Sequence, residues 1–93
     1  MHIGLLQIKL FLPGNQSLKG KRHIIKSIKD RVRNQVNISI AEVDEHDAWQ
    51  QAHIAIVTVG TDHKRVSQVL ASAMKLVENT PGLEVIDQQI EML

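Results

Sequence analysis

The sequence predicts an α+β fold of the ferredoxin-like type, in which a four-stranded antiparallel sheet carries two helices on one face. Apolar residues alternate at every second position from Leu6 to Leu12, gather in three further short segments, and recur every three to four positions in two others. The order of these segments is strand, helix, strand, strand, helix, strand. Two right-handed strand–helix–strand crossovers joined by a hairpin give this βαββαβ sandwich. The 93 residues suit a single domain over 1–93.

The first half of the chain supplies one strand and one helix. Residues 2–12 form the first predicted strand, because every second residue from position 6 onward is leucine or isoleucine. Turn-forming residues at 13–16 end this strand. Ser17 can cap a helix whose apolar stripe runs at helical spacing from Leu18 to Val32. No glycine marks the end of that helix.

The second half supplies a hairpin, a second helix and a last strand. Asn, Thr, Pro and Gly residues mark where the second helix stops. The predicted elements are a strand over 38–43, a polar connection over 44–50, a strand over 52–59, a helix opened by 60–62 and stopped by 79–82, and a strand over 83–90.

Apolar residues on both sides of the third predicted strand point to a homodimer. Ile54 and Ile56 lie on one side, whereas Val57 and Val59 lie on the other. Two helices can cover only one face of the sheet. We therefore expect a second copy of the chain to cover the open face. The alternative is that a partly apolar face stays exposed to water.

The composition excludes several classes of protein. Cysteine is absent, which removes disulfides, thiol nucleophiles and thiolate metal sites. No apolar run approaches the ~18 residues that a membrane span needs, and the first residues lack the pattern of a signal peptide. We expect a cytoplasmic protein without a cofactor.

Positive charge is concentrated in the first third of the chain, although the net charge is only +1. Residues 1–33 carry eight basic side chains and one acidic side chain, whereas 34–93 carry three basic and nine acidic ones. Five of the basic residues recur at intervals of 3, 4, 3 and 4, which aligns them on one side of the first helix. A row of like charges favours a polyanionic partner. The candidate nucleic-acid-binding residues are Lys19, Lys21, Arg22, Lys26, Lys29 and Arg33.

The alternative is an ordinary solvated helix face, since Lys and Arg are good helix formers. If the partner is RNA or a ribosomal subunit, the contacts should be to phosphates. RNA-recognition motifs of this fold stack bases on aromatic residues of the two central strands. The only aromatic residue of those strands here is Phe11. Recognition by shape rather than by base sequence is therefore expected.

Acidic residues crowd the predicted hairpin around 42–47. Glu42, Asp44, Glu45, His46, Asp47 and His53 belong to the chemical types that bind divalent metals. EF-hand spacing and helical His pairs are missing, so no metal is predicted. Aspartates also cap turns through their own backbone. In that interpretation Trp49 plugs the end of the core.

Sequence motifs for catalysis are missing. The chain has no GxSxG, Walker A or GxGxxG pattern, and no spacing pairs a nucleophile with a base. His46 with Asp47 is left as an acid–base alternative. We expect a protein that is not an enzyme and has no catalytic residues.

Two short runs resemble signatures of the uncharacterised bacterial YlxP-like family. Residues 17–22 (SLKGKR) are similar to its SLKEKR motif, and 43–50 (VDEHDAWQ) to its D-x-x-D-x-W motif. The resemblance extends to 60–62 and implies a ferredoxin-like fold. Members are typically encoded among transcription and translation factors, which implies a connection with RNA or the ribosome. Gly20 departs from the family's glutamate, so the capping box is lost and the first helical turn is weakened.

Two other functions stay open at this point. A ligand-binding module similar to the ACT domain would hold a small molecule at a dimer interface near Pro13 and Gly14. A purely structural or protein-interaction homodimer would use the open sheet face. Neither of these two functions involves the polyanionic partner that the row of basic residues favours.

Overall fold

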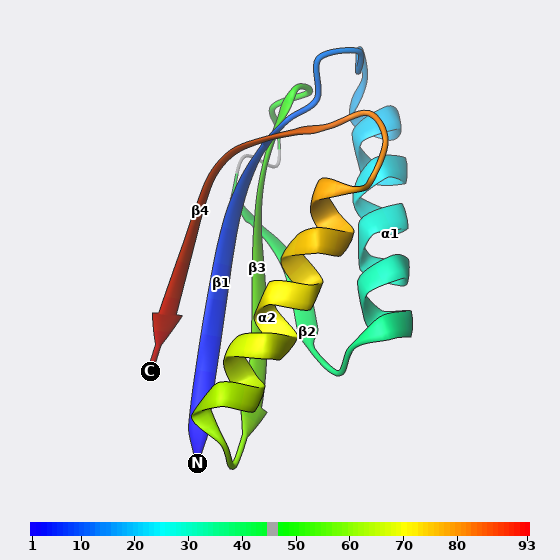
Figure 1. Ribbon diagram of the computed structural model, residues 1–93. Helices are drawn as coiled ribbons and strands as arrows, with labels where there is room; N and C mark the ends of the chain where they lie inside the picture. Colours follow the sequence, from blue (N-terminus) through cyan, green and yellow to red (C-terminus); the bar gives the residue numbers. More distant parts are fainter. Residues whose placement is uncertain (45–46) are drawn as a thin grey trace.

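The chain forms a four-stranded antiparallel sheet with both helices on the same face (Figure 1). The computed structural model describes residues 1–44 and 47–93. Its strand order is β2-β3-β1-β4, which puts β1 and β3 in the centre and confirms the ferredoxin-like prediction. The elements are β1 (His2–Phe11), α1 (Leu18–Gln35), β2 (Ser39–Asp44), β3 (Gln51–Gly60), α2 (His63–Glu78) and β4 (Glu84–Met92).

The core lies between the helices and one face of the two central strands. In β1, Leu6, Ile8 and Leu10 are fully buried. The antiparallel register places Leu6 opposite Ile56 and Ile8 opposite Ile54, so both strands direct branched side chains toward the helices. Burial of these side chains specifies the register, because a one-residue slip would turn them all toward the opposite face.

Side-chain caps begin both helices. Ser17 Oγ accepts a hydrogen bond from the backbone N–H of Gly20 at 3.0 Å, and Asp62 Oδ1 accepts one from that of Lys64 at 3.0 Å. Gly20 leaves room for the Asn15 side chain, since a Cβ at position 20 would overlap Asn15 Oδ1. The glycine that interrupts the capping box therefore permits a close packing contact in the first turn.

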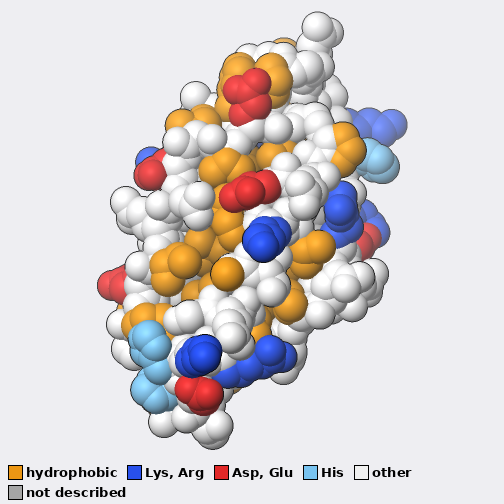
Figure 2. Space-filling model, in the orientation of Figure 1, with side chains coloured by type: hydrophobic (Ala, Val, Ile, Leu, Met, Phe, Trp, Pro, Cys, Tyr) orange, Lys and Arg blue, Asp and Glu red, His pale blue; other side chains and the backbone are white. Residues whose placement is uncertain are grey.

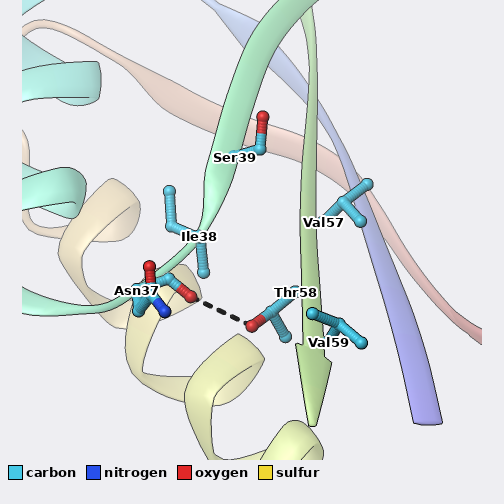
Figure 3. A pocket seen from close by; sticks show the side chains of 6 residues that line it. All are labelled: Asn37, Ile38, Ser39, Val57, Thr58 and Val59. Carbon is cyan, nitrogen blue, oxygen red and sulfur yellow. Dashed lines mark hydrogen bonds between the residues drawn. The ribbon is translucent and has the colours of Figure 1, made fainter. Parts of the chain in front are cut away.

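The end of β3 shows how the two sheet faces differ. Thr58 is buried, and its hydroxyl donates to the Asn37 carbonyl at 3.0 Å, whereas Val57 and Val59 point the other way (Figure 3). A shallow hollow of about 290 Å³ lies here, lined by polar and apolar residues without a charged side chain. The valines belong to the face that the helices leave uncovered, as predicted.

The outer strand β4 is poorly covered even on the helix side. Ile90 lies opposite the buried Leu6, yet it is 52% exposed, and Ile86 is exposed as well. Figure 2 shows hydrophobic side chains gathered between α2 and β4. Neither helix in the described part of the chain is long and apolar enough to cross a membrane.

Candidate nucleic-acid interface

A groove of about 310 Å³ runs between α1 and the outer strand β2, and cationic side chains dominate it. The apolar part of its lining is Ile25, and its carboxylates are Asp30 and Glu42. Successive turns of α1 contribute the cations, because residues three or four apart lie one above the other on a helix. These cations, which together we call the basic groove, are Arg22, Lys26, Lys29 and Arg33.

Most of the predicted phosphate-binding residues are accessible. Lys19 and the groove residues Arg22, Lys26 and Arg33 are exposed, and Lys29 is half-buried. Lys19 lies one turn before Arg22 on the helix and is not part of the groove lining. Figure 2 shows Lys and Arg side chains along the margin that α1 forms.

Lys21 was wrongly included among the predicted phosphate-binding residues, because its side chain points into the protein. It is 1% exposed. Its Nζ donates to the carbonyls of Ala48 and Gln51, at 2.8 and 2.9 Å, and lies 2.9 Å from Glu42 Oε2. A side chain so enclosed cannot reach a phosphate, so Lys21 ties α1 to the β2–β3 hairpin.

A signal in the sequence could have shown this. The buried positions of α1 are Lys21, Ile25, Ile28 and Val32, which recur at intervals of 4, 3 and 4. Position 21 thus belongs to the row of buried positions, although a search for apolar residues alone does not find it because it is a lysine. The sequence-based prediction placed Lys21 on the surface because it is charged, whereas its spacing from Ile25 places it on the buried face.

The groove cations differ in their local partners. Lys26 Nζ lies 2.8 Å from Asp30 Oδ2, and both side chains are exposed. This hydrogen bond, together with the positive charges of Lys26 and Arg33, lowers the pKa of Asp30 below its usual value. Arg33 Nη2 donates a long bond of 3.4 Å to the Ile40 carbonyl. Arg22 and Lys29 form no ion pair within the described ranges 1–44 and 47–93.

The register of the hairpin pairs Asp44 with His53, but Glu42 does not join them. Glu42 turns toward Lys21, whereas His53 lies on the open sheet face with its Nε2 2.9 Å from Gln7 Oε1. Among the described residues, no group of three His, Cys, Asp or Glu side chains could hold a metal ion. Glu45 and His46 lie outside the described residues.

Trp49 does not plug the end of the core, contrary to the sequence-based expectation. Its side chain is 54% exposed. Leu12 is fully buried at this end, and its N–H donates to the Gln50 carbonyl at 2.8 Å. The buried Lys21 side chain reaches the neighbouring Gln51 carbonyl, so these two residues, and not the indole, lie in the interior here.

The loop proposed for small-ligand binding has an open environment. Pro13 and Gly14 are exposed. A Cβ built on Gly14 would meet nothing within 4 Å among the residues described. A single copy of the chain therefore does not enclose a ligand at this glycine.

Fold and groove together define a small ferredoxin-like α+β domain with a cationic cleft beside its outer strand. The chain belongs to the family described as "Protein of unknown function (DUF503)", whose model matches residues 3–90. It is 29% identical over 82 residues to the uncharacterized protein YlxP of Bacillus subtilis strain 168, with 88% of this chain and 89% of that protein covered. The resemblance to YlxP-like proteins is thereby confirmed.

Solved structures share the fold at low sequence identity. The de novo designed protein Foldit4 aligns with a TM-score of 0.54 at 11% identity, covering 100% of this chain and 97% of that chain. A mutant of SnoaB, a cofactor-independent oxygenase from Streptomyces nogalater, aligns with a TM-score of 0.54 at 12% identity, covering 99% of this chain and 90% of that chain. A designed protein and an oxygenase on one scaffold show that this fold does not specify a function.

Proposed function

We propose that this protein is a cytoplasmic, non-enzymatic accessory factor that binds RNA or a ribosomal subunit through phosphate contacts in the basic groove. One observation carries the proposal: Arg22, Lys26, Lys29 and Arg33 line a single groove rather than scatter over α1. Two carboxylates, Asp30 and Glu42, share the lining, so positive charge is in excess.

The spacing of the cations suits a linear polyanion. Side chains three or four residues apart on a helix are about 5–6 Å from one another, so the groove presents regularly spaced positive charges. Like charges at this distance repel, and a phosphate backbone relieves the repulsion while it releases its own counterions. With four phosphate contacts to a single strand, the affinity should fall about 50-fold when the salt concentration rises from ~50 to ~200 mM.

Sedimentation of the native-level protein through a sucrose gradient of cell lysate, at ~50 and ~200 mM salt, tests the proposal. We expect the wild type to travel with a ribosomal subunit at low salt and to dissociate at high salt. The triple variant Arg22→Glu, Lys26→Glu and Arg33→Glu should stay at the top of both gradients.

A matched control variant distinguishes the effect of where the charges are reversed from the effect of the change in net charge. Lys64, Arg65 and Lys75 are exposed on α2, so reversing all three changes the net charge by the same amount. This control should keep its association. Equal loss in both triple variants, or wild-type protein at the top of both gradients, would contradict the proposal.

A homodimer through the open sheet face is a second proposal, supported by an apolar cluster at one end of that face. The register places Ile3 opposite Val59 and Leu5 opposite Val57, and the two valines are 63% and 37% exposed respectively. Val59→Asp should shift sedimentation equilibrium toward the monomer at high micromolar concentration. Ile90→Asp, on the helix side of β4, should not.

A further inference from the structure

The short segment before β3 is held firmly on its backbone while its tryptophan projects outward. The Asn15 side-chain amide donates to the carbonyls of Trp49 and Ser17. The Gln50 amide donates to the carbonyls of Pro13 and Asn15, at 3.2 and 3.3 Å. The loop between β1 and α1 thus holds the segment at the Trp49 carbonyl and at the Gln50 side chain.

Among the residues that the structure describes, none holds the indole itself by a hydrogen bond. It is 54% exposed and lines an open hollow of about 520 Å³ together with Asp47, Ala48, Gln50 and Gln51. An aromatic ring on an anchored backbone loses little conformational entropy when it binds a partner. Exposed tryptophans of this kind are common anchors in binding sites.

Trp49 lies at the Arg22 end of the basic groove. Lys21 links the two, since its Nζ contacts both Glu42, which lines the groove, and the Ala48 carbonyl next to Trp49. Arg22 follows Lys21 directly and opens the row of groove cations. Figure 1 shows the start of α1, the loop before it and the start of β3 meeting at one end of the molecule.

We propose that Trp49 stacks on an unpaired base of a single-stranded RNA whose phosphates lie along the basic groove. A positively charged groove combined with an aromatic stacking surface is how proteins bind single strands without sequence preference. A double helix keeps its base faces inside, so it could use only the cations. This inference rests on the proposed phosphate-binding function and narrows its substrate to single-stranded RNA.

The chain allows a direct test, because Trp49 is its only tryptophan. Intrinsic fluorescence would be recorded during titration with decauridylate, with a short RNA duplex and with inorganic polyphosphate, which has no bases. Anisotropy of a labelled decauridylate, and its displacement by the other two, would measure binding separately. We expect all three probes to bind and only decauridylate to quench the indole.

The variants Trp49→Ala and Trp49→Phe provide the matched comparison. Loss of one stacked base should weaken decauridylate binding by about 5- to 160-fold in Trp49→Ala, with polyphosphate binding unchanged. Trp49→Phe should keep most of the affinity. Urea unfolding of both variants would confirm that the fold is intact.

The remaining outcomes separate stacking from phosphate binding. Polyphosphate binding with no quenching by decauridylate would overturn stacking and leave the groove function standing. If none of the three probes binds, both proposals are overturned. Quenching or a blue shift that depends on protein concentration alone would assign the indole to contact between copies of the chain, which also overturns stacking.

Discussion

The two sides of α1 use lysine for opposite purposes. On the inner side, Lys21 is 1% exposed and bonds to Glu42, Ala48 and Gln51. On the outer side, Lys26 forms an exposed pair with Asp30 one turn away. The same ammonium group is thus a structural tie on one side and an accessible charge on the other.

The difference comes from desolvation. Removing an ammonium from water costs several kcal/mol, which only a nearly complete set of partners offsets. The inner side meets this condition with a carboxylate and two carbonyls. An exposed pair keeps its water and contributes about 0–1 kcal/mol. Inner-side changes should therefore affect folding, and outer-side changes should affect binding.

The largest expected effect is on the inner side. Lys21→Met keeps the aliphatic length but removes the ammonium that faces the Glu42 carboxylate and donates to two carbonyls. We expect a loss of about 3–5 kcal/mol in the free energy of unfolding, measured with urea. Lys26→Met should cost less than ~1 kcal/mol. Equal losses would show that the two sides do not differ.

A second substitution sharpens this result. In the Lys21→Met background, Glu42→Gln removes the carboxylate charge that Lys21 faced and should recover part of the lost stability. Alone, Glu42→Gln should destabilise the protein. If it recovers nothing in the double variant, charge is not the reason for the loss.

Neutralising the outer side should change binding without unfolding the protein. Arg22→Gln, Lys26→Gln and Arg33→Gln together remove three phosphate contacts, so the slope of log affinity against log salt should fall by about 2 for a single strand. Unfolding free energies should move by less than ~1 kcal/mol per substitution. Anisotropy at several salt concentrations provides the slope.

Asp30 should lower the affinity of the basic groove for phosphate, because its carboxylate pairs with the Lys26 ammonium. Lys26 must leave Asp30 to contact a phosphate, so Asp30→Asn should raise single-strand affinity by at most about fivefold at ~100 mM salt, the value of one full contact. Anisotropy at neutral pH would detect the gain.

The same carboxylate determines a small pH dependence of stability. The pKa of Asp30 is lower in the folded protein, so its stabilising contribution is present above the unfolded pKa of about 3.9. It is lost as the pH falls through the lowered folded value. The stability gap between wild type and Asp30→Asn should therefore close in acid.

The smallest effect should appear at the first turn of α1. Gly20→Ala normally gains about 0.5–1 kcal/mol in a helix, but here the new Cβ would displace the Asn15 side chain. We expect little net change in the wild type and the full gain in an Asn15→Ala background. A double-mutant cycle in urea measures the difference.

The sequence predicted the fold well, because β1 and both helices have a clear hydrophobic period. Strand alternation from Leu6 to Leu12 and the helical stripe from Ile25 to Val32 correspond closely to β1 and α1. Element ends were less certain: β4 extends to Met92, beyond the predicted end at residue 90. Its last residues are held by pairing with β1, which the pattern of β4 alone does not reveal.

The candidate site was predicted only in part. Helical spacing correctly aligned Arg22, Lys26, Lys29 and Arg33 on one side of α1. Lys21 was misplaced, because residue type outweighed its place in the row of buried positions. Trp49 was misplaced for the related reason that a large aromatic is usually buried.

The order of elements, the buried face of the two central strands and the cationic side of the first helix could be predicted without the structure. These follow from local periodicity, since side-chain direction repeats every two or 3.6 residues. Three other features emerged only in the folded chain: β2 lies beside α1 to form the basic groove, Glu42 and two carbonyls surround Lys21, and Trp49 projects outward. Those features depend on contacts between distant segments, and their energies depend on which groups lose water when the segments meet.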